Sequence, residues 1–219
     1  MARGKLIVIE GIDGSGKATQ TKLLVERAKE RGYLVNTMSF PIYDTPSGKR
    51  ITDYLEGVKK AGPKSASKLY ADNRFDAKKS IENELEMKVN IILDRYTSSN
   101  YLHQASKYNT EKKKIEMINW ISYYEFVKLA LPVPDAILYL DLNPKSAIES
   151  IKKRGRKMDL HEKDEKHLIN AWKTGDMISE LDIIPGWKRF YCMKPNGMRK
   201  EKKELNDELL DYVTHILAK

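Results

Sequence analysis

Cysteine is nearly absent from this sequence of 219 residues, which contains a single one, Cys192. One cysteine cannot form an internal disulfide, and such scarcity favours a reducing compartment. Because Cys192 follows the apolar and aromatic run at 187–191, we expect a buried, unreactive thiol rather than a nucleophile. A chain of this length can bury roughly 70% of its unfolded surface, so we expect a sizeable core without disulfides.

Long apolar runs are also missing. The longest apolar region, 129–142, is broken by Pro132, Pro134 and Asp135, and is far shorter than the ~20 residues of a membrane span. No basic cluster followed by an apolar stretch, the mark of a secretory signal, opens the sequence. We therefore expect a cytoplasmic protein that does not associate with a membrane.

Acidic residues are in the minority, with 31 Asp and Glu against 40 Lys and Arg, which gives a formal net charge of +9. Such a charge can indicate nucleic-acid binding. The basic residues, however, alternate with acidic ones, as in "EKKKIE" and "RKEKKELNDE", a pattern typical of solvated helix faces. Surplus positive charge also suits a protein that gathers phosphorylated ligands. We expect no specific nucleic-acid partner.

Strand-like and helix-like segments alternate along the chain. Short apolar runs predict strands at 5–10, 34–40, 88–94, 135–142 and 186–193. Helical periodicity follows the first run, fills most of 47–87 apart from a break at 61–63, and returns at 203–218. This order predicts an α/β fold, a doubly wound five-stranded parallel sheet flanked by helices in one domain (1–219), with ligands at the carboxyl ends of the strands.

The segment "GIDGSGKATQ" (11–20) lies between the first predicted strand and its helix, the context in which a GxxxxGK pattern cradles phosphates. Its glycines let backbone N–H groups point inward at a helix N-terminus, and the lysine would neutralise the β- and γ-phosphates. We predict that ATP binds to Gly11, Ile12, Asp13, Gly14, Ser15, Gly16, Lys17, Ala18 and Thr19.

One expected group is missing from that loop. Ala18 stands where the pattern has a Ser or Thr whose hydroxyl binds Mg²⁺. Either the metal is held by other residues, or the site has lost its chemistry. Asp13 is also unusual, because a carboxylate beside a triphosphate is unfavourable, so we expect it to meet a sugar hydroxyl.

A carboxylate and a guanidinium, Asp94 and Arg95, follow the third predicted strand in "LDRY". Side by side at a strand end, they can serve Mg²⁺ and phosphate respectively. The alternative is a structural ion pair that closes the strand.

Four segments stand out by their order and spacing: "GIDGSGKATQT" at 11–21, "FP" at 40–41, "YADNR" at 70–74 and "DRYTSSN" at 94–100. Together they resemble the thymidylate kinase (dTMP kinase) family over essentially the whole chain. The resemblance implies the fold of a nucleoside monophosphate kinase with a lid over ATP, usually as a homodimer. It also implies Mg²⁺- and ATP-dependent phosphorylation of dTMP to dTDP.

The resemblance assigns the sugar and phosphate of dTMP to three residues. Asp13 would hold the 3′-hydroxyl, in agreement with the charge argument, and Arg95 would bind the phosphate. His103 stands where the family often has a tyrosine close to the sugar, so this position departs from the family pattern and bears on discrimination against a 2′-hydroxyl.

The thymine would lie among five further residues. Phe40 and Tyr70 would pack on or near the ring, with plain core packing as the alternative for both. Arg74, one helical turn after Tyr70, would reach a thymine carbonyl. Asn100 would lie beside the base, and Gln104 matches a glutamine seen in part of the family.

The segment "KKRGRKMDLHEKD" (152–164) is the candidate lid. In the family, an arginine that neutralises the transferred phosphoryl group comes from the lid or from the loop position held here by Gly14. Glycine cannot serve, so Arg154 and Arg156 are the candidates, unless they are merely solvated.

We expect the metal to be held by two carboxylates. Asp159 and Glu162 match a D-x-x-E pattern that lies near the metal in some family members. Asp94 and Asp159 would then hold Mg²⁺ directly or through water. His161 and His167 lack the i, i+4 spacing of a helical metal pair, so we expect them at the surface or behind the direct ligands.

Two other functions stay open. A kinase for dUMP or a modified pyrimidine monophosphate would use the same chemistry. A nucleotide-binding protein without catalysis is favoured by Ala18 and the net charge, but it would leave Asp13, Arg74 and Arg95 without a common purpose.

Overall fold

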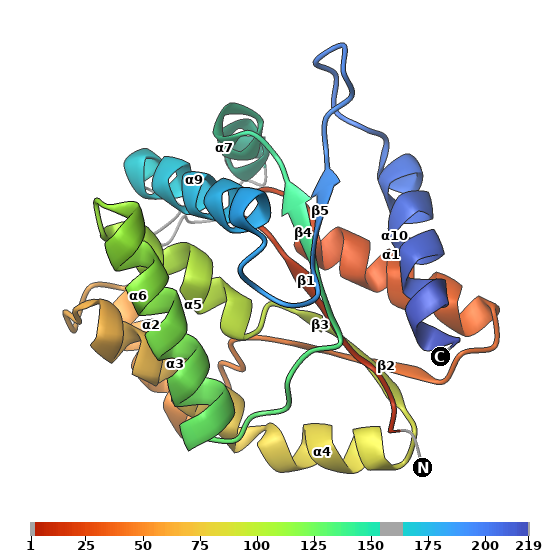
Figure 1. Ribbon diagram of the computed structural model, residues 1–219, viewed down its shortest axis with the longest axis horizontal. Coiled ribbons are helices and arrows are strands. Elements are labelled where there is room, and N and C mark those ends of the chain that lie inside the picture. Colours follow the sequence, from red (N-terminus) through yellow and green to blue (C-terminus); the bar gives the residue numbers. More distant parts are fainter. Residues whose placement is uncertain (1–2, 154–163, 219) are drawn as a thin grey trace.

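The computed structural model describes residues 3–153 and 164–218. Within these residues, five parallel strands form one sheet in the order β2-β3-β1-β4-β5 (Figure 1). They are β1 Leu6–Glu10, β2 Val35–Ser39, β3 Asn90–Asp94, β4 Ala136–Asp141 and β5 Trp187–Tyr191. The predicted doubly wound five-stranded sheet is confirmed. Because β1 pairs with β3 on one side and β4 on the other, the crevice for a ligand lies at its carboxyl end.

Helices connect the strands. They are α1 Lys17–Glu30, α2 Pro46–Leu55, α3 Pro63–Asp76, α4 Lys78–Glu86, α5 Thr97–His103, α6 Glu111–Ser122, α7 Pro144–Lys153, α9 Glu165–Leu181 and α10 Lys202–Leu217. Two short turns, the 3₁₀ η1 Ala105–Lys107 and the π-helical η2 Tyr123–Lys128, follow α5 and α6. None of the helices in the described part of the chain is both long and apolar enough to cross a membrane.

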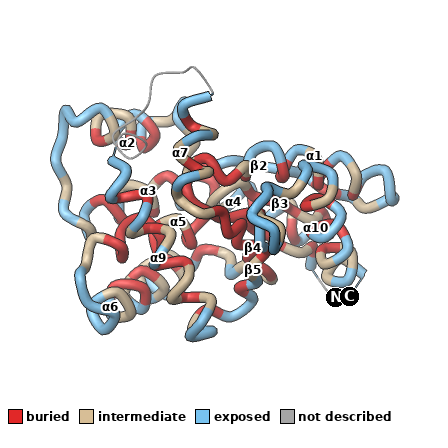
Figure 2. The backbone as a smooth tube through the Cα atoms, turned by 90° about the horizontal axis from the view of Figure 1, so that it is seen from above, coloured by how far each residue is buried: buried red, intermediate tan, exposed pale blue. Residues whose placement is uncertain are grey.

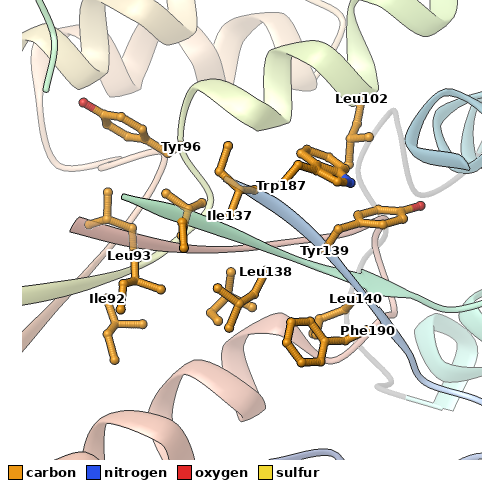
Figure 3. Packing of buried hydrophobic residues seen from close by; sticks show 14 of the residues in the cluster. Ile92, Leu93, Tyr96, Leu102, Ile137, Leu138, Tyr139, Leu140, Trp187 and Phe190 are labelled. Atoms are coloured by element: carbon orange, nitrogen blue, oxygen red, sulfur yellow. The ribbon is translucent and has the colours of Figure 1, made fainter. Parts of the chain in front are cut away.

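The sheet is the middle layer of the molecule. Helices α1 and α10 pack together on one face, and α5 and α9 lie with α3 and α6 across the other (Figure 1). Every residue of β1 and β4 is buried, as expected for strands covered on both faces (Figure 2). Along β4, Ile137 and Tyr139 point to one face and Leu138 and Leu140 to the other (Figure 3).

Cys192 lies directly after β5 and is 1% exposed. Burial raises the pKa of its thiol to about 12, so the reactive thiolate is scarce at neutral pH. The predicted burial of the thiol is confirmed.

Candidate active site

The loop between β1 and α1 takes the conformation that its glycines permit. Gly14 and Gly16 have φ angles of 87° and 102°, which residues with a side chain rarely adopt. A Cβ on Gly14 would lie 2.3 Å from the carbonyl oxygen of Ala147 in α7. The ammonium of Lys17 donates to the carbonyls of Gly11 and Ile12 at 2.8 and 2.9 Å. The loop and its lysine thus form a compact positive site at the N-terminus of α1.

Opposing effects set the pKa of Lys17. Burial and the neighbouring Arg95 lower its pKa to about 8, while Asp13, Asp94 and Glu10 partly oppose the shift. Because this folded pKa lies below the ordinary value of 10.5 for a lysine, the group makes the nucleotide-free protein more stable as pH rises from about 8 to 10.5. Below pH 8 the lysine is charged and ready to meet an anionic phosphate.

We expect the affinity for ATP to fall above pH 8, approaching about 10-fold per pH unit, because only the charged lysine attracts phosphate. Titration with a fluorescent ATP analogue between pH 6.5 and 9.5 at fixed Mg²⁺ measures this. Lys17→Met is the control and should bind weakly, without the inflection near pH 8. An equally steep fall in that variant would assign the effect to another group.

Arg95 follows β3 and lies among three carboxylates. Its Nη2 is ion-paired with Asp13 Oδ1, and its Nη1 lies 4.0 Å from Glu10 Oε1. Burial disfavours the charged guanidinium, but Asp13, Glu10 and Asp94 together outweigh burial and raise the pKa of Arg95 further. Arg95 is therefore a permanent cation beside the phosphate loop. The Asp13 carboxylate contacts this cation, and its bond to a sugar hydroxyl stays a prediction.

Glu10, at the end of β1, is fully buried and joins the loop to α5. Its carboxylate accepts hydrogen bonds from the Gly11 amide and from the hydroxyls of Ser98 and Ser99 at 2.7 to 2.9 Å. These bonds fix the loop relative to α5, the helix that carries Asn100 and His103, two of the residues predicted to bind dTMP.

Asp94 supplies the feature that best fits a metal. Its Oδ1 is buried and has no hydrogen-bond partner in the structure. Asp94 lines a cavity of about 890 Å³ together with Lys17, Ala18 and Thr19. Carboxylate oxygens are preferred ligands of Mg²⁺, which otherwise keeps water and phosphate oxygens. Asp94 therefore fits the predicted role, whereas no three of the described His, Cys, Asp and Glu residues form a metal-binding group.

A second cavity of about 550 Å³ adjoins the first. All the residues predicted to bind the acceptor line it: Asp13, Phe40, Tyr70, Arg74, Arg95, Asn100, His103 and Gln104. Phe40 also packs against Tyr96 at 5.8 Å between ring centroids, and Tyr70 against Tyr54 at 6.4 Å. Phe40 thus belongs to the hydrophobic core as well as to the cavity wall, whereas Tyr70 is a half-buried residue of the wall.

Glu125, in η2, organises one wall of this cavity and was not predicted from the sequence. Its carboxylate is 1% exposed and accepts two hydrogen bonds from Arg74 at 2.7 Å, from Nε and Nη2. Thr97 Oγ1 and Asn100 Nδ2 donate to it at 2.8 Å. Arg74 is therefore held as half of a buried ion pair, and Nη1 and the second N–H of Nη2 remain as donors for a ligand.

The partners of two amides fix which way each one points. A carboxylate only accepts, so Asn100 turns its Nδ2 to Glu125 and leaves Oδ1 as its other polar atom. The Lys107 ammonium only donates, and it lies 2.7 Å from Gln104 Oε1, which leaves the amide Nε2. Asn100 shares Glu125 Oε1 with Arg74 and lies one helical turn before Gln104, and all three residues line the cavity.

The remaining sequence predictions concern His167 and the predicted lid. His167 is 9% exposed and its Nε2 lies 3.1 Å from His103 Nδ1, so of the two places expected for it, the one behind the residues that line the site is where it lies. Most of the predicted lid lies outside the described residues, with Arg154, Arg156 and Asp159.

Comparison with known proteins gives a consistent picture. A family model for thymidylate kinase matches residues 9–178. The thymidylate kinase of Danio rerio is 31% identical over 145 residues, which cover 66% of this chain and 64% of that protein. The probable thymidylate kinase of Archaeoglobus fulgidus is 33% identical over 152 residues, 69% of this chain and 71% of that protein.

The solved structure of thymidylate kinase from Candida albicans superposes with a TM-score of 0.77 at 25% identity, covering 98% of this chain and 93% of that one. The match to the Danio rerio protein, in contrast, spans just under two thirds of that relative's length.

Proposed function

Because the chain belongs to the thymidylate kinase family, we propose that it transfers the γ-phosphoryl group of ATP to the phosphate of dTMP, giving dTDP. The observation that carries this proposal is the acceptor cavity, which combines a cation for a phosphate, aromatic walls for a base and a fixed set of polar atoms. The cavity adjoins the phosphate loop, since Asp13, Phe40 and Arg95 line both.

The polar atoms favour a pyrimidine with two carbonyl groups. Thymine and uracil present carbonyl, N–H and carbonyl along one edge, which complements a donor from Arg74, an acceptor from Asn100 and a donor from Gln104. Cytosine presents an amino group and an unprotonated ring nitrogen instead. At least one buried donor or acceptor would then stay unpaired, which is costly.

Transfer requires positioning and charge neutralisation more than acid–base chemistry, because the acceptor is already an anionic phosphate. Lys17 and the loop N–H groups hold the donor phosphates, and Arg95 holds the acceptor phosphate. Asp94 would hold Mg²⁺, which would supply further positive charge to the phosphate oxygens. Arg154 and Arg156 remain the candidates for a lid cation, and Asp159 for a second metal ligand.

A coupled assay with ATP and a panel of dTMP, dUMP, TMP and dCMP tests this function. We expect dTMP to be preferred over dUMP by only about 5-fold, the value of one apolar methyl contact of ~1 kcal/mol. The kcat/KM for dCMP should be lower by about 10³-fold or more. ATP binding without turnover of any acceptor would instead support the non-catalytic alternative, and equal use of dCMP would refute the recognition scheme.

We further propose a homodimer in the cytoplasm. Large apolar side chains are exposed on α3 and η2, namely Phe75, Tyr123 and Val127. Exposed large apolar side chains of this kind are candidates for burial in an interface. Sedimentation velocity measures the assembly, and a Tyr123→Glu, Val127→Glu double variant should sediment as a monomer. A wild-type protein that is monomeric at micromolar concentration would contradict the proposal.

A further inference from the structure

A chain of hydrogen bonds connects Arg95 to the first turn of α9. Arg95 Nη1 lies 3.3 Å from His103 Nε2, and His103 Nδ1 lies 3.1 Å from His167 Nε2. Both histidines are buried, at 7% and 9% exposure, and their rings stack with 5.3 Å between centroids. Two residues of the cavity wall that are eight positions apart, Arg95 and His103, are thus joined to a helix residue 64 positions further along the chain.

The donors and acceptors available on the three side chains fix the direction of each hydrogen bond in this series. A guanidinium can only donate, so His103 Nε2 must accept and carry no proton. The proton of neutral His103 then sits on Nδ1 and is donated to His167 Nε2. His167 is therefore the acceptor that fixes the tautomer of His103. With the other tautomer, two donors would face each other at His103 and Arg95.

The backbone of His167 is also fixed. Its amide donates to the side chain of Asp164, the N-cap residue of α9, at 2.9 Å. The imidazole therefore comes from a rigid helix of 17 residues. Asp13 holds Arg95 from the other side through Nη2, so the two contacts together define the plane of the guanidinium.

We propose that His167 is a positioning residue for phosphoryl transfer, which orients the Arg95 guanidinium by fixing the tautomer and rotation of His103. The proposal rests on the proposed function only in giving Arg95 the acceptor phosphate as its ligand. His167 itself lines the far side of His103 and does not line the acceptor cavity.

Substitutions at His167 separate the hydrogen bond from the packing. His167→Leu keeps the volume but removes the acceptor, so kcat/KM for dTMP should fall by about 10-fold or more, with the KM for ATP changed less than about 2-fold. His167→Gln places an amide oxygen near the position of Nε2 and should recover most of that loss. The matched control is His215→Gln on the exposed side of α10, which should match the wild type.

A spectroscopic measurement tests this series of hydrogen bonds without an activity assay. Long-range ¹H–¹⁵N spectra of the ligand-free protein distinguish the two neutral tautomers, and the histidine variants assign the signals. We expect the Nδ1–H form for both His103 and His167 in the wild type, and loss of that form at His103 in His167→Leu. This result holds whether or not dTMP is the acceptor, so it fails independently of the proposed function.

Three results would overturn the inference. One is an Nε2–H tautomer at His103. Another is a His167→Leu protein that is less stable to heat but has an unchanged kcat/KM for dTMP, which would make His167 a packing residue only. The third is a His167→Gln variant as impaired as His167→Leu, which would exclude the hydrogen bond as the cause.

Discussion

Replacing Asp94 by alanine is expected to abolish phosphoryl transfer, with kcat lowered by about 10³-fold or more. Asp94 Oδ1 is buried without a hydrogen-bond partner beside Lys17, and the loop lacks the hydroxyl that would otherwise hold Mg²⁺. The proposed metal site would therefore depend on this carboxylate more than a site in a loop with Ser or Thr at position 18 would. Steady-state rates over a range of Mg²⁺ concentrations measure the effect.

Two further variants make that result specific. Asp94→Asn keeps the shape of the side chain and should be nearly as inactive. Thermal unfolding of this variant measures whether the fold is retained. Ala18→Ser restores the missing hydroxyl and should change the Mg²⁺ dependence only modestly. If Asp94→Ala kept near-normal activity, the metal would have to be held by other residues.

The fold could be predicted because its signals are local. The strands β1 and β4 are short apolar runs with polar residues at their carboxyl ends, and β1 leads directly into the glycine-rich loop. The helical stretch at 47–87 was harder to divide. Pro63 marks the start of α3 in the sequence, but α3 and α4 are separated only at Ala77, where no helix-breaking residue stands.

The lining residues of the acceptor cavity that the sequence predicted lie in short motifs at strand ends and on two helices, α3 and α5. The groups that orient them could not be predicted. Glu125 is 51 residues from Arg74, and His167 is 64 residues from His103. Nothing local marks a glutamate within "YYEFVK" as the partner of a distant arginine. Such pairs arise only when helices pack.

Glu125 gives the largest expected effect on stability. Glu125→Ala leaves the Arg74 guanidinium, which is 2% exposed, without its counter-charge in a place that water does not reach. Removing one partner of a buried ion pair costs about 3–5 kcal/mol, a large fraction of the stability of a typical domain. Thr97 Oγ1 also loses its acceptor. Urea unfolding at constant m-value measures the loss, and a change under about 1 kcal/mol would contradict a buried, paired arginine.

A double variant separates stability from recognition. Arg74→Met with Glu125→Leu removes both charges and fills a similar volume, so it should recover most of the stability that Glu125→Ala loses. It should not recover kcat/KM for dTMP, because the Arg74 donor is absent and the Asn100 amide is no longer held by Glu125. Full activity in the stable double variant would show that the ion pair serves the fold alone. Low activity in a stable protein would show that the Arg74–Glu125 pair is needed for the cavity to recognise a base, apart from what the pair contributes to stability.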